Sequence, residues 1–369
     1  MTEQDFIPKY SPEILSNGSV TWESPSNIAL VKYWGKKENQ IPANPSISFT
    51  LSGCKTTTTL SYTKKMSEGY SFEVWLEGVE KESFKPKIET FFKRIEAYVP
   101  FIKEYHFKIE TSNTFPHSSG IASSASGMSA LALCLMSVEK ELSDVNVIQS
   151  VSEESFDDDY FNKKASFLAR LGSGSACRSI EGDLVGWGWH KDIEESSDLY
   201  GVKYPFEVHD NFKNYQDTIL LVDKGEKQVS STVGHGLMHN HPFAEHRFEQ
   251  AHENLSSLIN VFKEGDLNAF IEIVESEALT LHAMMMTSMP YFILMKPNTL
   301  EIINKTWRYR NDTGSKLCFT LDAGANVHLL YPESESKEVV EFIKNELVAH
   351  CQNGQYICDQ IGFGAKKIA

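Results

Sequence analysis

The sequence predicts an α+β fold of two domains, and three observations lead to this prediction. With 369 residues, the chain exceeds the roughly 250–300 residues at which single hydrophobic cores stop growing. Its first part contains runs rich in Thr, Ile, Val and aromatic residues, which are typical of β-strands. From Thr218 onward, strand-like and long helix-like runs alternate, as expected when helices cover one face of a sheet. We place one domain over residues 1–205 and the second over 206–369.

A mixed or antiparallel sheet is expected in the first domain, because its strand-like runs show partial alternation of apolar and polar residues. Apolar residues at the helical period of 3.6 predict its helices. We expect strands over 47–51, 56–62, 71–75, 105–109 and 187–190, and helices over 84–99 and 161–171. Residues 1–19 are polar with scattered prolines, so we expect them to lie over the surface.

The same periodicities predict the elements of the second domain. Strands are expected over 219–222, 317–321 and 327–331, and helices over 247–262, 266–285, 299–310 and 337–349, followed by a short segment near Tyr356. No internal repeat is evident.

Composition and charge disfavour several classes of partner. The net charge of −15 disfavours a nucleic acid or an anionic membrane, because neither is attracted to an acidic surface. The first residues show no leader pattern, and the longest apolar run, residues 130–136, is far shorter than the roughly 20 residues that span a bilayer. The six cysteines contain no Cys-x-x-Cys pair, which suits reduced thiols in a core. We therefore expect a cytoplasmic protein.

A stretch of small and hydroxyl residues precedes a strongly apolar run at residues 115–127. Gly120 permits a tight turn, and the following helix directs the positive end of its dipole at the loop. Hydroxyl and N–H donors come from Ser118, Ser119, Ser123 and Ser124. These features predict a phosphate-binding loop that is neither a P-loop nor a dinucleotide-binding motif. The alternative is an ordinary capped helix with a Ser-rich entry.

Two charged residues lie within apolar runs in opposite halves of the chain. Lys32 follows Ile-Ala-Leu-Val, and Asp322 follows Phe-Thr-Leu and precedes Ala-Gly. A buried lysine must pair, snorkel or change its pKa, and aspartate is rarely buried without a partner. Lys32 is thus the natural candidate partner of Asp322. The alternative for Lys32 is an outward-facing side chain on an alternating strand.

A second glycine-serine cluster, Gly172-Ser-Gly-Ser-Ala-Cys-Arg-Ser179, follows the helix expected over 161–171. The rigid guanidinium fork of Arg178 suits a carboxylate or a phosphate, so the cluster predicts a site for a doubly anionic molecule. The alternative is a helix end with a surface arginine.

Two further charged groups are weaker candidates for sites. The acidic run over 153–159 is more typical of a solvated face than of a metal site. The group His235, His239, His241 and His246 does not complete a zinc signature, since Pro242 interrupts any continuous helix.

Four motifs together resemble the diphosphomevalonate decarboxylase family of the GHMP kinase superfamily. They are Asn27-Ile-Ala-Leu-Val-Lys-Tyr-Trp-Gly-Lys36, Phe115-Pro-x-x-x-Gly-x-Ala-Ser-Ser-Ala-x-Gly127, Gly172-Ser-Gly-Ser-Ala-Cys-Arg-Ser179 and Asp322-Ala-Gly-x-Asn326. The resemblance implies a ribosomal-S5-like N-terminal domain and a ferredoxin-like C-terminal domain with the active site in the cleft between them. It also implies ATP-dependent decarboxylation of mevalonate 5-diphosphate to isopentenyl diphosphate in isoprenoid biosynthesis, with Mg²⁺ as cofactor.

The resemblance further implies roles for individual residues. Asp322 would accept the proton of the C3 hydroxyl, Lys32 would balance its charge, and Arg178 would hold the substrate carboxylate. The nucleotide loop would comprise Ser118, Ser119, Gly120, Ala122, Ser123 and Ser124, with Ser124 as the Mg²⁺ contact. Substrate contacts would come from Asn27, Tyr33, Lys36, Ser173, Ser175, Arg178 and Ser231. The family is often dimeric, so a homodimer is expected.

The chain departs from the usual family pattern at three places. His117-Ser-Ser stands where Thr-Ala-Ala is common, His235 stands where the family usually has Met, and Ala325 replaces a proline. Two alternative functions remain open at this point. One is a kinase of the same superfamily that phosphorylates the 3-hydroxyl of mevalonate or a mevalonate phosphate without decarboxylation. The other is a non-catalytic nucleotide-binding homologue.

Overall fold

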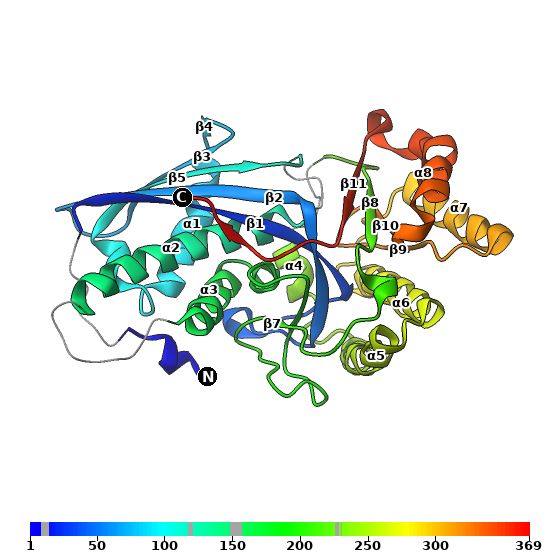
Figure 1. The fold of residues 1–369 in the computed structure, drawn as a ribbon, viewed down its shortest axis with the longest axis horizontal. Helices are drawn as coiled ribbons and strands as arrows, with labels where there is room; N and C mark the ends of the chain where they lie inside the picture. The colour runs from blue at the N-terminus through cyan, green and yellow to red at the C-terminus, as the bar shows by residue number, and fades with distance from the viewer. Residues whose placement is uncertain (9–14, 117–120, 148–156, 226–228, 230) are drawn as a thin grey trace.

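The computed structural model describes residues 1–8, 15–116, 121–147, 157–225, 229 and 231–369 (Figure 1). The first sheet is built around two long antiparallel strands, β1 (Asn17–Val31) and β2 (Ser46–Lys64). Its order is β12-β1-β2-β5-β3-β4, with β6 pairing β2 and β7 pairing β6. The remaining strands are β3 (Ser71–Leu76), β4 (Val79–Glu80), β5 (Tyr105–Asn113), β6 (Leu184–Trp187), β7 (Val202–Lys203) and β12 (Lys366–Lys367). Since β3 and β5 are parallel and the other pairs of strands are antiparallel, the sheet is mixed, which is one of the two arrangements expected.

Strand β2 changes its burial pattern along its length. Its first six residues, from Ser46 to Leu51, are all buried, whereas buried and partly exposed residues alternate from Cys54 to Thr63. Alternation is typical of a strand with one face on a core, and a continuous buried run is typical of a strand covered on both faces. The first part of β2 therefore lies between two layers of the molecule.

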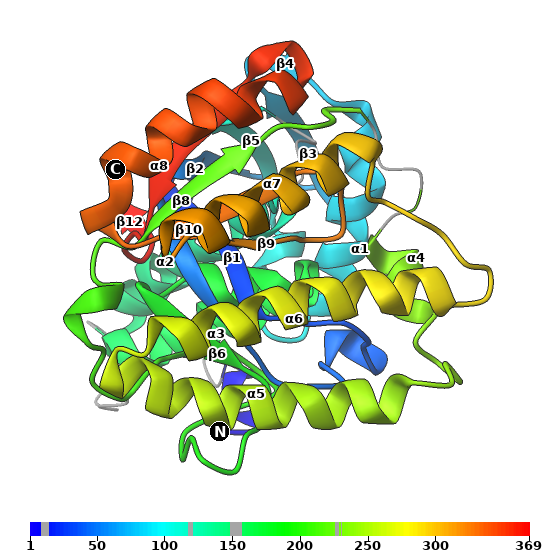
Figure 2. The ribbon, with the colours of Figure 1, turned by 90° about the vertical axis from the view of Figure 1, so that its right-hand side faces the viewer.

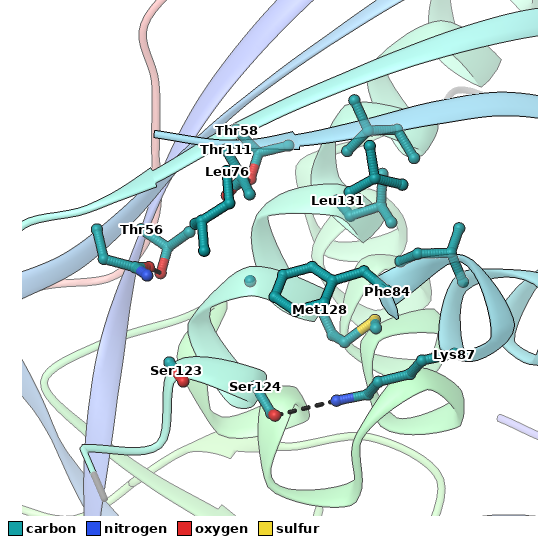
Figure 3. Close-up of a pocket in the computed structure, with 15 residues that line it drawn as sticks. Thr56, Thr58, Leu76, Phe84, Lys87, Thr111, Ser123, Ser124, Met128 and Leu131 are labelled. Atoms are coloured by element: carbon teal, nitrogen blue, oxygen red, sulfur yellow. Dashed lines mark hydrogen bonds between the residues drawn. The ribbon is translucent and has the colours of Figure 1, made fainter. Parts of the chain in front are cut away.

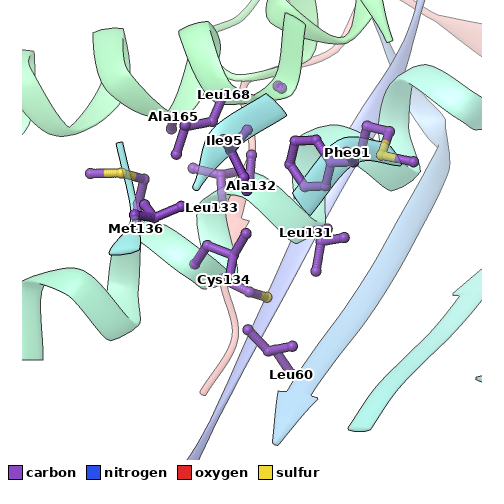
Figure 4. Close-up of a cluster of buried hydrophobic side chains, with 14 of the residues drawn as sticks. Leu60, Phe91, Ile95, Leu131, Ala132, Leu133, Cys134, Met136, Ala165 and Leu168 are labelled. Atoms are coloured by element: carbon purple, nitrogen blue, oxygen red, sulfur yellow. The ribbon is translucent and has the colours of Figure 1, made fainter. Parts of the chain in front are cut away.

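Helix α2 (Ser123–Val147) fills the centre of the first core. It packs against β1 and β2 on one side and against α3 (Asp158–Gly172) on the other, with α1 (Lys85–Ile95) also packed on α3. Every residue from 130 to 136 is buried, and Figure 4 shows Leu131 and Cys134 on the side of Leu60 in β2, and Ala132 near Ala165 of α3. A helix that is apolar on most of its surface is stable only when it is enclosed in this way.

The second sheet is antiparallel, with the order β11-β8-β10-β9. Its strands are β8 (Gln216–Leu220), β9 (Cys318–Thr320), β10 (Val327–Tyr331) and β11 (Tyr356–Gln360). Its helices are α4 (Ser231–Gly236), α5 (Ala244–Glu264), α6 (Leu267–Thr287), α7 (Pro297–Thr313) and α8 (Ser336–Phe342). Figure 2 shows α5, α6 and α7 side by side in front of the strands.

A sharp connection pairs α5 with α6. Gly265 ends α5 in the left-handed region (φ 75°), where glycine has no steric penalty. Asp266 follows at once and caps α6, its carboxylate accepting the N–H groups of Asn268 and Ala269. The two helices therefore run antiparallel in contact with each other.

The two sheets share a core. One cluster of buried side chains contains Ile28 and Leu30 of β1 together with Leu255 of α5 and Val274 of α6. Asp359 of β11 also accepts the backbone N–H groups of Gly53 and Cys54 in β2, each at 2.7 Å. The halves are thus joined by apolar burial and by hydrogen bonds.

The structure corrects several expectations on local elements. Phe6 is fully buried and stacks on Phe167 at 4.6 Å, so the first residues do not all lie over the surface. The strand expected over 187–190 ends at Trp187, and the helix expected over 337–349 changes after Phe342 to a π-helical segment, Ile343–Leu347. The strands expected over 47–51 and 56–62 are one strand. The last strand, β12, returns to β1, and the domain boundary near residue 205 stays a prediction.

Candidate functional site

Lys32 and Asp322 meet where the two sheets join. Lys32 directly follows β1, and its Nζ lies 3.0 Å from Oδ1 of Asp322. The Lys32 side chain is 2% exposed and that of Asp322 is 30% exposed. The predicted pairing is confirmed, and the alternative of an outward-facing lysine is wrong.

The environment of Lys32 combines burial with negative charge. Burial lowers the pKa of the Lys32 ammonium below its ordinary value, and the carboxylates of Asp322 and Glu277 oppose this change. Asp322 lies in the turn between β9 and β10, as expected from its position before Ala-Gly. The site therefore contains a buried ammonium group next to a carboxylate that is partly exposed to solvent.

Arg178 is buried, not on the surface. It lies in a short 3-10 helix, Gly174–Ser179, that follows α3, and it is 3% exposed. Its Nη1 donates to Oγ of Ser46 at 2.6 Å, and its guanidinium lies 5.7 Å from the ring centre of Trp187. The amide of Asn27 accepts from Arg178 and donates to Oγ of Ser179. Asn27 thus orients the guanidinium.

Tyr33 is held in an aromatic cluster next to Arg178. Its ring lies 4.6 Å from that of Trp187 and 4.2 Å from that of His235. A Cβ on Gly174 would approach the Tyr33 hydroxyl to 2.9 Å, so the cluster requires glycine there. The main-chain oxygen of Ser175 accepts from Asn27 at 3.2 Å. The structure therefore brings Asn27, Tyr33 and the second glycine-serine cluster together.

His235 is a neutral imidazole in this cluster. Its Nδ1 accepts the N–H of Gly35 at 3.0 Å. Burial, with smaller contributions from the charges of Lys36 and Arg178, lowers the pKa of His235 to about 3. Lys36 itself donates to Gln40 at 2.8 Å. The His235 ring is therefore uncharged, and the positive charges of Lys36 and Arg178, both candidates for anion binding, act on it.

An apolar cavity of about 180 Å³ lies beside the start of α2 (Figure 3). Its walls come from β2, β3, β5, α1 and α2 and include Leu76, Phe84, Met128 and Leu131. Ser123 and Ser124 lie at one end, where Nζ of Lys87 donates to Oγ of Ser124 at 3.0 Å. Lys87 is exposed as a residue, while partial desolvation of its ammonium by the surrounding groups lowers its pKa. The cavity thus combines apolar walls with hydroxyls and a cation.

The start of α2 is only partly described. Ser118, Ser119 and Gly120, like His117, lie outside the described residues, as does the side chain of Ser231. Ala122 precedes α2 with a φ of 40°, a conformation that is uncommon for alanine and that often marks a functional turn. Oγ of Ser26 in β1 donates to the carbonyl of Ile121 at 2.8 Å, which ties the loop to the sheet.

Three charged residues were not anticipated as part of the site. Lys87 lies in a lysine-rich helix start that resembles a solvated face, and nothing in its sequence context distinguishes it. Arg247 in α5 and Glu277 in α6 form a fully buried ion pair. Both lie on the apolar stripes of their helices, since Arg247 precedes Ala251 and Leu255 at four-residue spacing and Glu277 lies between Val274 and Leu281. A charged residue on the apolar face of a helix is the feature of the sequence that could have identified Arg247 and Glu277.

The remaining histidines and acidic residues are described in part, since residues 153–156 of the acidic run lie outside the described residues. In the described ranges, no group of three or more His, Cys, Asp or Glu side chains is arranged to hold a metal ion. His241 is buried and bonds to the carbonyl of Met284, and Asp157 caps α3. Five of the six cysteines are buried and all are free thiols. None of the helices in these ranges has the length and apolar character needed to cross a membrane.

Comparison with known proteins places this arrangement in a class. The fold matches a solved complex of MDDEF with MVAPP, AMPPCP and magnesium with a TM-score of 0.78 and 27% identity, over 96% of this chain and 99% of that one. It matches mevalonate diphosphate decarboxylase from Staphylococcus aureus with the same TM-score and 26% identity, over 96% and 98% of the two chains. The molecule is thus a two-domain α+β enzyme of the GHMP kinase-like class.

Sequence comparison identifies the family within that class. The family model for the diphosphomevalonate decarboxylase-like N-terminal domain matches residues 24–198, and that for the mevalonate 5-diphosphate decarboxylase C-terminal domain matches residues 218–364. The diphosphomevalonate decarboxylase of Ganoderma lucidum is 29% identical over 345 residues, which cover 88% of this chain and 80% of that protein. The chain belongs to the diphosphomevalonate decarboxylase family.

Proposed function

We propose that this enzyme converts mevalonate 5-diphosphate and ATP to isopentenyl diphosphate, ADP, phosphate and carbon dioxide. The observation that carries the proposal is the Lys32–Asp322 ion pair at the junction of the two sheets, in a chain of this family. Phosphoryl transfer needs a group that takes the proton of the attacking hydroxyl and charges that offset the phosphate. A carboxylate with a buried ammonium 3.0 Å away supplies both.

Asp322 is the proposed base for the C3 hydroxyl. Its carboxylate accepts the hydroxyl proton as the oxygen attacks the γ-phosphate, and Lys32 offsets the negative charge that gathers around the reacting atoms. The phosphorylated C3 oxygen then leaves as phosphate. The electron pair of the C–CO₂⁻ bond forms the new double bond as carbon dioxide departs, so that atoms and charge balance.

Arg178 is the proposed partner of the substrate carboxylate. It is held by Ser46 and Asn27 and packed on Trp187, so its planar fork is oriented before substrate binds. We assign diphosphate and substrate contacts to Tyr33, Lys36, Ser173, Ser175 and Ser231, which flank Arg178 in sequence or carry the family motifs. This set supplies polar donors and one further ammonium.

The cavity beside α2 is the proposed site for the base of ATP. Its apolar walls suit a planar heterocycle, and Lys87, Ser123 and Ser124 at its end suit phosphates near the start of a helix. The hydroxyl of Ser124, at the start of α2, would help to hold Mg²⁺ together with the phosphates of ATP. The charge of the metal ion would neutralise phosphate charge.

An assay of product formation tests the proposal. ADP and carbon dioxide release are measured with mevalonate 5-diphosphate, mevalonate and mevalonate 5-phosphate in parallel. We expect equal amounts of both products with the diphosphate alone. ADP without carbon dioxide would indicate a kinase, and neither product would indicate a nucleotide-binding homologue. The expected homodimer is tested by light scattering, and the cytoplasmic location stays a prediction.

A further inference from the structure

Helix α6 contacts the backbone of both members of the Lys32–Asp322 pair. Oε2 of Glu277 accepts the backbone N–H of Lys32 at 2.8 Å. His282 lies further along the same helix, and its Nε2 is 3.1 Å from the backbone carbonyl of Asp322. A carbonyl can only accept, so Nε2 of His282 donates this hydrogen bond. One rigid helix therefore holds two residues that lie 290 positions apart in the sequence.

Arg247 adds a second hydrogen bond to the backbone of Lys32. Its guanidinium binds the Glu277 carboxylate through both terminal nitrogens, and Nη2 also donates to the Lys32 carbonyl at 3.0 Å. Asn254 donates to Oε1 of Glu277 at 2.6 Å. Lys32 lies just beyond β1, and the Arg247–Glu277 pair bonds to both its N–H and its C=O. These contacts fix the origin of the lysine side chain.

Burial of this ion pair is not explained by stability alone. The side chains of Arg247 and Glu277 are fully buried, and an apolar pair of similar volume often serves stability as well or better. His282 is buried, and burial lowers its pKa to about 4, so the ring is neutral near pH 7 and keeps the proton of Nε2 for the Asp322 carbonyl. The two contacts of α6, one through Glu277 with Arg247 and one through His282, are therefore made by polar groups whose hydrogen bonds have defined directions.

The geometry points to α6 as the positioning element of the active site: Glu277, assisted by Arg247, and His282 set the separation and orientation of Lys32 and Asp322. This inference rests on the catalytic roles proposed for these two residues. Neither Glu277 nor His282 needs to touch substrate. Their contribution is to hold the ammonium and the carboxylate at the distance that the proton transfer requires.

Two substitutions at His282 test the inference. His282→Leu removes the donor to Asp322, whereas His282→Gln keeps an N–H group at similar reach. We expect His282→Leu to lower kcat by about tenfold, the upper range for one lost hydrogen bond, with the KM for ATP unchanged. His282→Gln should keep kcat within about twofold of the wild type. Equal losses in both variants, or none in His282→Leu, would overturn the inference for this residue.

Glu277→Gln tests the other anchor, and Glu275→Gln is its matched control. Glu275 lies on the same helix with its carboxylate paired to Arg310 and bonded to Trp307, and it makes no contact with Lys32 in the described part of the chain. We expect kcat to fall roughly 10–100-fold in Glu277→Gln, since a misplacement of about 1 Å can cost about 100-fold. Glu275→Gln should affect stability alone. Similar kcat values in two folded variants would contradict the inference.

The pH profile of kcat separates positioning from a general loss of stability. When the ammonium moves away from the Asp322 carboxylate, the carboxylate takes up a proton more readily. Glu277→Gln also removes a negative charge beside Lys32, which favours the ionised Asp322 carboxylate and opposes this shift. The limb is therefore compared in His282→Leu, where it should move to higher pH, and in Glu275→Gln, where it should not. An unchanged limb in His282→Leu counts against positioning. Should Glu277→Gln fail to fold, the His282 pair still decides the question.

Lys32→Met and Asp322→Asn, assayed in parallel, distinguish failure of the inference from failure of the proposed mechanism. If both are inactive while Glu277→Gln and His282→Leu are folded and fully active, only the positioning role fails. If either Lys32→Met or Asp322→Asn retains substantial activity, the catalytic roles on which the inference rests fail.

Discussion

The apolar cavity beside α2 and the Lys32–Asp322 pair differ in how far apart along the chain their residues lie. All residues that line the cavity come from positions 56–131, within the first sheet and its helices. The ion pair joins residues 290 positions apart and is anchored by α5 and α6. Many side chains line the cavity, so each contributes only part of the binding. In the pair, Lys32 alone supplies the positive charge and Asp322 alone supplies the carboxylate. Substitutions in the pair should therefore abolish turnover, and those at the cavity should weaken binding by degrees.

The largest effect is expected from Asp322 and Lys32. Asp322→Asn should lower ADP release by at least about 10³-fold, within the range for loss of a general base, and Lys32→Met should cost nearly as much. The double variant should lose little more than either single variant, because the two groups work as a unit. Rate losses that add in this cycle would show that the base lies elsewhere.

Arg178→Gln should lower kcat by at least ~100-fold, the range for loss of one charge-stabilising donor. Its guanidinium is held by Ser46 and Asn27, and the proposed partner is the substrate carboxylate. ATP binding, measured by calorimetry, should be unchanged, because the cavity is elsewhere. Near-normal kinetics would remove the role assigned to Arg178.

Lys87→Met should raise the KM for ATP by about tenfold, the scale of one hydrogen bond to a charged group, and leave the KM for mevalonate 5-diphosphate unchanged. Lys85→Met is the matched control, because Lys85 is on the same helix but pairs with Glu82. Steady-state kinetics with each substrate varied in turn give both constants. Equal changes in the two variants would place the nucleotide away from this cavity.

Ser124→Ala should weaken ATP·Mg²⁺ binding more than substrate binding, by a few-fold, since it removes one hydroxyl oxygen next to Lys87. Titration of each ligand into the folded variant provides the comparison. Equal losses for both ligands would indicate a folding defect, which circular dichroism would reveal independently.

The smallest effect concerns acid stability at His235. Its pKa is about 3 in the fold against an ordinary value of 6.5, so below pH 6.5 the unfolded chain binds a proton that the folded chain does not. Stability is therefore lost as pH falls from 6.5 toward 3, by up to about 1.4 kcal/mol per pH unit. His235→Met should lose about 2 kcal/mol less than the wild type between pH 7.5 and 5.0 in urea unfolding experiments. Parallel pH dependences would contradict this.

The sequence was most informative where a charge interrupts an apolar run. Lys32 and Asp322 were paired from this signal, and the structure confirms their contact. The same signal existed at Arg247 and Glu277, but it is visible only on a helical projection, because residues on one face of a helix lie three or four positions apart in the sequence. Lys87 gave no signal, since its exposed neighbours make the helix start resemble any solvated face.

Strand and helix types followed from local periodicity, because each element must bury one face or one stripe. Element ends were less predictable: the strand that ends at Trp187 and the π-helical segment after Phe342 depend on neighbours that local sequence does not specify. The burial of Phe6 against Phe167 likewise depends on a contact between residues far apart in the chain.

The sequence by itself determined the α+β class, the pairing of Lys32 with Asp322 and the resemblance to the family. Only the tertiary structure decided that α6 touches the backbone of both Lys32 and Asp322, and that Asn27 and Ser46 orient Arg178. The physical reason is the separation in sequence over which each kind of information acts. Periodicity and residue type report what each segment must bury, whereas the direction of a hydrogen bond between distant segments is set by how the two sheets pack on their shared core.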